Sequence, residues 1–148
     1  MLTVKEISAE ATYELRHKAL HLNKPVKAYQ YPGDDLDTTF HLGAFENRKL
    51  TGVASFYMEG TDAIHSHKQL RMRGMAVDEP DQDLRIGTTV LHKANRILYH
   101  GNAEYLWCHA KTSAQPFYER IGFSQIGDAF ATKTNDAYVI LYKKIEKP

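Results

Sequence analysis

Residues 70–91, LRMRGMAVDEPDQDLRIGTTVL, decide the fold of this chain, because they join an apolar strand to an amphipathic helix. We expect a strand over residues 70–77, in which Gly74 permits a β-bulge that splays the backbone. A helix follows from Arg85, and helical spacing places four apolar residues on one of its faces: Ile86, Val90, Ala94 and Ile97. The unit is a strand, a polar turn and a helix, and the free N–H groups of a helix N-terminus form a site for anionic phosphate.

Length and composition limit the function classes. The 148 residues suit one domain over residues 1–148, and 43% hydrophobic and 25% charged residues are typical of a soluble globular protein. The formal net charge is +1, from 19 basic and 18 acidic residues, so no overall field favours nucleic acid or an anionic membrane. We therefore expect no nucleic-acid partner, and any anionic ligand must be held by a local site.

The N-terminus and the cysteine content indicate the compartment. The start MLTVKEISAE lacks the apolar segment of a signal peptide, and no apolar run approaches the ~20 residues of a membrane span. We expect a cytoplasmic protein without membrane contact. Cys108 is the only cysteine, which excludes an internal disulfide and a zinc site built on several thiolates. Its place in an apparent strand favours a buried, unreactive thiol over a nucleophile.

The rest of the chain alternates short strands and helices. Further strands are predicted at residues 2–7, 40–45, 50–58, 103–109, 123–130 and 137–142. Helices are predicted from Ser8, as a cap, to Leu20 and over residues 114–120, the latter capped by Thr112 or Ser113. Residues 23–38 are expected to form a loop, and residues 46–49 a hairpin turn. This order indicates an α/β domain with a mixed sheet.

The start of the long helix leaves two interpretations open. Gln82, Arg85 and Gly87 follow the spacing of a phosphate-binding turn, but such turns usually contain several glycines. Asp83 also places a negative charge where an anion would lie. The alternative is an ordinary helix start with Asp81 or Asp83 as its cap. The turn lacks the lysine and hydroxyl residue of a nucleotide-triphosphate loop, which argues against ATP or GTP hydrolysis.

A second motif, SAQPFYERIGF at residues 113–123, predicts a short helix that ends at a glycine and leads into a strand. With this motif the chain resembles the GNAT superfamily of N-acetyltransferases. In that family a strand, a Q/R-x-x-G-x-G/A pyrophosphate turn and a long helix precede an A-x-x-x-Y-x-x-x-G-F helix and strand. The residues that match the two patterns are Gln82, Gly87, Ala114, Tyr118, Gly122 and Phe123.

Bacterial members of the family are similar over longer segments. These segments are RGMAV at residues 73–77, WCHAKTSA at 107–114, PGD at 32–34 and FHLGAF at 40–45. The resemblance covers most of the chain and is strongest over residues 70–123. It implies a GNAT fold: a central mixed, mostly antiparallel sheet of about six to seven strands, flanked by helices, with a splayed central strand.

The resemblance implies an acetyl-CoA-dependent N-acetyltransferase. The acetyl group would pass directly from acetyl-CoA, the cosubstrate, to a primary amine of a small molecule or peptide, without a metal. The pantetheine arm would pair with the backbone of Met75, Ala76 and Val77, and an N–H near Ala76 or Val77 would stabilise the oxyanion. The other residues expected to contact the cosubstrate are Gln82, Asp83, Leu84, Arg85, Ile86, Gly87, Thr88, Ser113 and Phe117.

Tyr118 occupies the position of the family's general acid, which protonates the departing CoA thiolate. A phenol with an unperturbed pKa of ~10 stays protonated at neutral pH and can donate to a thiolate with a pKa of ~8.5. The structural alternative is that Tyr118 only packs beside Phe117 on the sheet. The motif position favours the acid.

Several assignments stay open on the sequence alone. The general base can be Glu59, His65, Asp136 or a water chain. The acceptor would be set by the loops at residues 23–38 and 130–137, and relatives often form homodimers. One alternative function is a non-catalytic acyl-CoA-binding or regulatory module with a degenerate pyrophosphate turn. Another is an interaction domain that has lost CoA.

Charged side chains suggest two further hypotheses. Arg71 and Arg73 share a face of the predicted strand, so they either bind a carboxylate-bearing acceptor or extend to solvent. Three acidic residues, Asp34, Asp35 and Asp37, form either a solvated loop or a patch that attracts a cationic acceptor. His65 and His67 have no third ligand nearby, which favours a solvated loop over a metal site.

Overall fold

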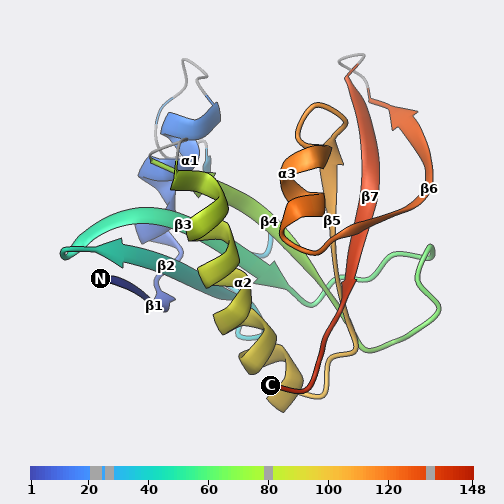
Figure 1. Ribbon diagram of the computed structural model, residues 1–148, viewed down its shortest axis with the longest axis horizontal. Coiled ribbons are helices and arrows are strands. Elements are labelled where there is room, and N and C mark those ends of the chain that lie inside the picture. The colour runs from blue at the N-terminus through green and yellow to red at the C-terminus, as the bar shows by residue number, and fades with distance from the viewer. Residues whose placement is uncertain (21–24, 26–28, 79–81, 133–135) are drawn as a thin grey trace.

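The computed structural model describes residues 1–148 except 21–24, 26–28, 79–81 and 133–135 (Figure 1). Its strands are β1 (Leu2–Ile7), β2 (Phe40–Glu46), β3 (Lys49–Tyr57), β4 (Gln69–Val77), β5 (Tyr105–Lys111), β6 (Ser124–Ala131) and β7 (Ala137–Lys144). Its helices are the short 3-10 helix η1 (Glu10–Thr12), α1 (Tyr13–Leu20), α2 (Asp83–His100) and α3 (Gln115–Arg120). The order of strands and α-helices is the one that the sequence predicts. Most boundaries shift by one or two residues, but α1 begins only at Tyr13, after the unpredicted η1.

All seven strands belong to one sheet, in the order β1-β2-β3-β4-β5-β7-β6. Neighbouring strands are antiparallel except β4 and β5, which are parallel and are joined through α2. The mixed, mostly antiparallel sheet of the prediction is therefore confirmed. The expected hairpin between β2 and β3 is also present, and its turn residues Asn47 and Arg48 have positive φ angles of 50° and 70°, as a tight hairpin turn requires.

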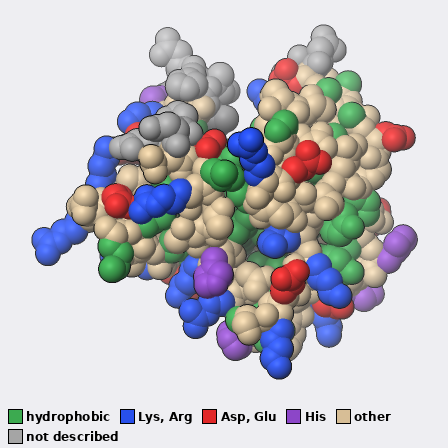
Figure 2. All heavy atoms as spheres, viewed as in Figure 1, with side chains coloured by type: hydrophobic (Ala, Val, Ile, Leu, Met, Phe, Trp, Pro, Cys, Tyr) green, Lys and Arg blue, Asp and Glu red, His purple; other side chains and the backbone are tan. Residues whose placement is uncertain are grey.

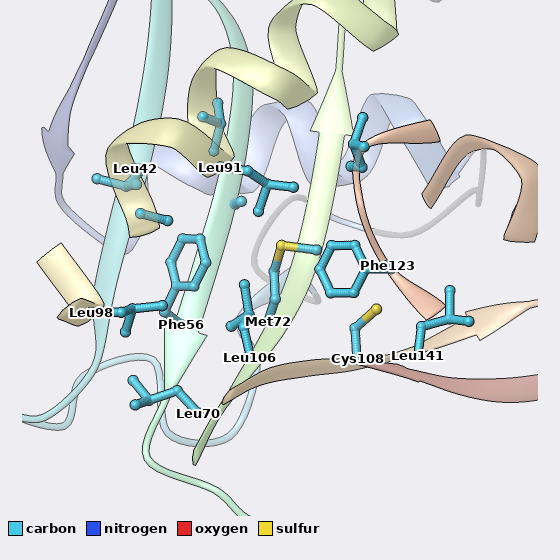
Figure 3. Packing of buried hydrophobic residues seen from close by; sticks show 14 of the residues in the cluster. Leu42, Phe56, Leu70, Met72, Leu91, Leu98, Leu106, Cys108, Phe123 and Leu141 are labelled. Atoms are coloured by element: carbon cyan, nitrogen blue, oxygen red, sulfur yellow. The ribbon is translucent and has the colours of Figure 1, made fainter. Parts of the chain in front are cut away.

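The main core lies between α2 and one face of the sheet. The predicted apolar stripe is confirmed, since Ile86, Val90 and Ala94 are buried and Ile97 packs partly buried against them. The sheet supplies the opposing side chains, among them Leu42, Phe56, Met72, Leu106 and Leu141 (Figure 3). A smaller cluster lies on the other face, where Leu15 of α1 packs on Val53 and Ala76. The sheet is thus covered by α2 on one face and by α1 on the other.

Gly74 produces the predicted bulge in β4. Its φ is +66°, and the pairing with β3 shifts there, because Ser55 pairs with Arg73 but Val53 pairs with Ala76. One extra residue reverses the alternation of side chains along the strand. Met72 therefore faces α2 before the bulge, whereas Ala76 faces α1 beyond it.

The bulge lies where β4 and β5 separate. The two strands pair only from Gln69 with Tyr105 to Arg71 with Trp107. Beyond these pairs β4 stays bonded to β3 as far as Val77, and β5 stays bonded to β7 as far as Lys111. The ribbon shows the two strands diverging toward the end where α2 begins (Figure 1). The splayed central strand is therefore confirmed.

The helix caps differ in part from the prediction. Ser8 does accept a bond from the Ala11 N–H at 3.2 Å, but the first turn after it is the 3-10 helix η1. The predicted caps of the short helix, Thr112 and Ser113, are wrong, because α3 starts after Ala114, which has no polar side chain. Backbone groups replace the missing cap, with the Gln115 N–H bonded to the Thr112 carbonyl at 3.3 Å. No described helix is long and apolar enough to cross a membrane.

Candidate functional site

The start of α2 has the geometry of an anion site. Gln82 is the N-cap residue, with φ −106° and ψ 5°, and no side chain caps this helix among the described residues. Asp83 lies inside the first turn, so the hypothesis that it caps the helix is wrong, and Asp81 lies outside the described residues. The first N–H groups of a helix lack partners within it, and the helix dipole favours an anion there.

Arg85 is paired with an acidic residue of the β2–β3 hairpin. It lies in the regular helix, and its Nη2 is 3.1 Å from Oε2 of Glu46 at the end of β2. A hollow of about 480 Å³ borders this ion pair and reaches Gln82 at the start of the helix. The arginine that replaces a family glycine is thus accommodated by the hairpin next to it.

Gly87 allows α3 to pack directly on α2. A Cβ at this position would lie 2.9 Å from Cζ of Phe117 and 3.7 Å from Cδ1 of Ile121. Such a close approach leaves no room for a side chain unless the Phe117 ring moves. The structure therefore brings together two residues that the resemblance assigns to the cosubstrate, Gly87 and Phe117, whereas Ser113 is exposed before α3.

Tyr118 packs between aromatic rings on the α2 side of the sheet. Its ring centroid lies 5.1 Å from that of Phe117 and 5.8 Å from that of Phe123. Burial raises the pKa of its hydroxyl, and the nearby Cys108 thiol adds to the effect, so Tyr118 is protonated at neutral pH. Cys108 is the first residue of β5 beyond its last pair with β4. Tyr118 is therefore placed beside the separation of the two strands.

Cys108 itself is buried, as predicted. It faces Phe123 and Leu141 in the core (Figure 3). Burial raises the pKa of its thiol to about 12, which keeps it protonated and poorly nucleophilic.

The edge of β4 that faces the separation carries unpaired backbone groups. The Asp78 N–H donates to the Thr51 carbonyl at 2.8 Å, on the side of β3. Successive N–H groups of a strand point to opposite sides, so the Val77 N–H points away from β3, to the side from which β5 has departed. The sequence left Ala76 and Val77 open as the source of the N–H that would stabilise the oxyanion. Only the Val77 N–H points to the side from which a carbonyl oxygen could approach.

The molecular surface is indented beside the part of the molecule that carries α3. Figure 2 shows this notch at the top of the face. A separate hollow, about 1400 Å³, lies along η1 and α1. Asp78 lines that hollow and is paired there with Lys18 and with Lys49.

A buried ion pair on the α1 face is the main feature that the sequence reasoning missed. Arg16 and Asp34 are only 1% and 4% exposed, and Nη1 of Arg16 lies 2.7 Å from Oδ2 of Asp34. The Tyr57 hydroxyl donates to Oδ1 of Asp34 at 2.5 Å, and Nη2 of Arg16 donates to the Ser55 hydroxyl at 2.8 Å. Burial alone would raise the pKa of Asp34, but the bonds from Arg16 and Tyr57 lower it, so the carboxylate is ionised.

This pair corrects the interpretation of the acidic loop. Asp34 is neither solvated nor open to a cationic acceptor, whereas Asp35 and Asp37 are exposed as expected. The sequence did contain one signal, because Arg16 is adjacent to Leu15 on the side of α1 that also buries Thr12. A charged residue on the apolar side of a helix calls for a buried partner.

The three candidate bases come from separate parts of the structure. Oε2 of Glu59 lies 2.5 Å from Nη1 of Arg71, and Oδ2 of Asp136 lies 3.8 Å from Nζ of Lys111. His65 is exposed in the connection before β4. The described residues contain no group of three or more His, Cys, Asp or Glu that could hold a metal ion.

Comparison with known proteins agrees with this geometry. A family model described as an acetyltransferase (GNAT) domain matches residues 6–136. The chain belongs to the GNAT acetyltransferase family. It is also 30% identical over 145 residues to the uncharacterized N-acetyltransferase YitI of Bacillus subtilis (strain 168), covering 98% of this chain and 97% of that protein. Members of this family are enzymes that use acetyl-CoA to acetylate amines, and this GNAT chain is such an acetyltransferase.

Solved GNAT structures share the fold over the whole chain. An aminoglycoside 6'-acetyltransferase of type Ii superposes with a TM-score of 0.76 at 10% identity, covering 99% of each chain. The ribosomal-protein-S18-alanine N-acetyltransferase of Escherichia coli superposes with a TM-score of 0.72 at 17% identity, covering 100% of this chain and 96% of that one. At these identities the similarity concerns the fold, and the acceptors of the two enzymes differ.

Proposed function

We propose that this GNAT acetyltransferase transfers the acetyl group of acetyl-CoA directly to a primary amine of a small molecule or peptide. The observation that carries the proposal is the separation of β4 from β5. It leaves the Val77 N–H on one side, and Tyr118, next to Cys108 of β5, on the other.

The residues of the chain fit acetyl-CoA as a cosubstrate. The first turn of α2, from Asp83 to Thr88, would hold the pyrophosphate with its N–H groups, since no described side chain caps the helix. The open edge of β4, at Met75–Val77, would pair with the pantetheine amides. Gln82, Leu84 and Ile86 flank this turn, and Ser113 and Phe117 approach it from α3.

Two groups would act on the reacting atoms. The Val77 N–H would donate to the carbonyl oxygen on which negative charge develops as the amine nitrogen attacks. The new C–N bond forms as the C–S bond breaks, and the Tyr118 hydroxyl would give its proton to the departing sulfur. The amine must reach the site unprotonated, and Glu59, His65, Asp136 or a water chain would accept its proton.

Calorimetric titration with acetyl-CoA tests the proposal, with desulfo-CoA and ATP as comparison ligands. We expect saturable binding of acetyl-CoA and desulfo-CoA at one site and weaker binding of ATP, which lacks pantetheine. Gly87→Trp should abolish this binding, because even a Cβ there lies 2.9 Å from the Phe117 ring. Gly101→Trp is the matched control at the other end of α2, where an added Cβ meets nothing closer than 3.5 Å.

Turnover then separates the enzyme from its alternatives. An acceptor panel of amino acids, their amides, a polyamine and an aminoglycoside should include at least one amine that the protein acetylates. Binding of acetyl-CoA without turnover that depends on Tyr118 would favour the non-catalytic acyl-CoA-binding module. Absence of binding up to millimolar acetyl-CoA would favour an interaction domain.

A further inference from the structure

Arg73 lies at the separation of the strands, on the face opposite α2. It pairs in register with Ser55 of β3 and directly precedes the Gly74 bulge. Its place in β4 is two residues beyond Arg71, where the pairing with β5 ends. The half-buried Arg73 side chain therefore lies on the face from which an acceptor would approach, since α2 and α3 occupy the other face.

Among the described residues, Arg73 has no acidic partner. Three basic residues of α1, β4 and β5 are paired instead: Arg16 with Asp34 at 2.7 Å, Arg71 with Glu59 at 2.5 Å, and Lys111 with Asp136 at 3.8 Å. In the part of the chain that the structure describes, the Arg73 side chain forms neither an ion pair nor a hydrogen bond. Its guanidinium donors are therefore available to a ligand.

Aromatic rings hold the Arg73 guanidinium in place. Its Cζ lies 4.6 Å from the ring centroid of Tyr31 and 6.0 Å from that of Tyr57. Asp34 fixes both tyrosines, because it accepts the Tyr31 N–H at 2.8 Å and the Tyr57 hydroxyl at 2.5 Å. Stacking leaves the in-plane N–H groups of a guanidinium free to bind a carboxylate in a forked geometry.

His109 of β5 supplies a second donor on the same face. Its Nδ1 lies 3.3 Å from Nη2 of Arg71, and an arginine can only donate, so Nδ1 accepts and the ring proton is on Nε2. Burial lowers the pKa of His109; the charges of Arg71 and Arg73 lower it further, while Glu59 opposes them. The ring centroids of Trp107 and Phe130 lie 5.2 Å and 5.4 Å from the centroid of the His109 imidazole.

We propose that Arg73 binds a carboxylate of the acceptor, so that this enzyme prefers amines that carry a carboxylate over neutral or polycationic amines. The inference rests on the proposed function and names the acceptor class of the same site. An ionised carboxylate would compensate the unpaired charge of Arg73, whereas a polyamine would bring further positive charge beside it. A free amino acid and the C-terminus of a peptide share this chemistry.

Steady-state kinetics with matched acceptors tests the proposal. The panel contains the twenty amino acids, their amides, dipeptides with free and amidated C-termini, and spermidine. We expect kcat/KM of the wild type to be at least about tenfold higher for acceptors with a free carboxylate than for the matching amides. This ratio corresponds to the free energy of one hydrogen bond to a charged group. The dipeptides show whether the carboxylate comes from a free amino acid or a peptide end.

Arg73→Met removes the charge and keeps the aliphatic stem. We expect it to lower kcat/KM for acids by about 10- to 100-fold, with little change for amides or in KM for acetyl-CoA. Arg73→Lys should retain part of the preference, and Arg96→Met, on the exposed side of α2, should change nothing. Equal turnover of acids and amides by the wild type, or an equal loss for both in Arg73→Met, would overturn the proposal.

A binding measurement separates this proposal from the proposed function. The pKa of His109 is followed by NMR, with its signal assigned through His109→Gln, in the presence of each amino acid or its amide. We expect amino acids that bind to raise this pKa and amides to leave it unchanged, and the rise to disappear in Arg73→Met. No rise with any amino acid overturns carboxylate binding, whereas absence of acetyl-CoA binding in calorimetry would overturn the enzymatic proposal instead.

Discussion

At the scale of single residues, two polar side chains on opposite faces of the sheet, the partly buried Tyr118 and the buried Asp34, differ in role. Tyr118 is held among apolar rings, and its burial favours the neutral phenol that a proton donor must be. Asp34 is held as an anion by Arg16 and Tyr57, and it fixes the tyrosines around Arg73. The first would act on the reacting sulfur, and the second acts through the position of its neighbours.

Tyr118→Phe should reduce kcat by about 10²- to 10⁴-fold, because it removes general acid catalysis and keeps the ring that packs on Phe123. The raised pKa fixes the direction of the pH dependence. A donor with a raised pKa keeps its proton to higher pH, so any loss of activity due to Tyr118 should begin above its ordinary pKa of ~10. A pH profile of kcat checks this, and an alkaline limb near pH 8 that vanishes in Tyr118→Phe would contradict it.

Arg16→Met should destabilise the fold by about 3–5 kcal/mol, because it leaves the Asp34 carboxylate buried without its counter-ion. Urea unfolding measures the loss, and the double variant Arg16→Met with Asp34→Leu should recover part of it. If the double variant recovers none of the lost free energy of unfolding, the hydrogen-bond network around Tyr57 and Ser55, rather than the charge pair, provides the stabilisation.

The pH dependence of stability follows from the same pair. The pKa of Asp34 is lower in the folded protein than in the unfolded chain, so its contribution is complete above the unfolded value of ~3.9. That contribution is lost as the pH falls through the lower, folded pKa. Asp34→Asn should therefore flatten the acid limb of the stability curve, and an unchanged limb would contradict the assignment.

At the scale of elements, local sequence patterns predicted the structural features that are determined by residues close together in the sequence. The apolar stripe of α2, the hairpin turn at Asn47 and Arg48, and the bulge at Gly74 all follow from spacing or backbone freedom. The pairing of Arg16 with Asp34 joins residues 18 positions apart, and no local period encodes it. The caps of α2 and α3 were also missed, because the N-cap residues are Gln82 and Ala114, and neither side chain bonds to its helix.

Val77→Pro tests the β4 edge as an element. Proline has no backbone N–H, so the substitution removes the Val77 N–H that points away from β3. The Asp78 N–H keeps its bond to the Thr51 carbonyl. The extended backbone of Ala76 suits a residue before proline. We expect kcat to fall by about 10²- to 10³-fold, as for loss of one oxyanion donor, with the circular dichroism spectrum unchanged. Val77→Ala keeps the N–H and is the control, so an equal loss in both variants would exclude the N–H as the cause.

At the scale of the whole molecule, the family motifs gave the fold class, but the strand order required the structure. The position of β7 between β5 and β6 depends on long-range pairing that short windows of sequence do not contain. The proposed acceptor site depends on the same long-range pairing, since Arg73 comes from β4, Tyr31 from the loop before β2, and His109 from β5. The expectation of a homodimer stays a prediction.

The short contact between β4 and β5 makes the protein two half-sheets joined along a narrow seam. Only three residue pairs of the sheet join the four-stranded half, β1 to β4, to the three-stranded half, β5 to β7, and α2 connects the two halves along the chain. In the proposed complex the pantetheine arm would occupy the missing length of that seam and act as an inserted eighth strand. Ligand that binds only the folded state adds about 2.7 kcal/mol at a concentration of 100 times Kd. The stability of this enzyme would then rise and fall with the acetyl-CoA supply of the cell, and the metabolite would be a structural part of the sheet as well as the substrate of the enzyme.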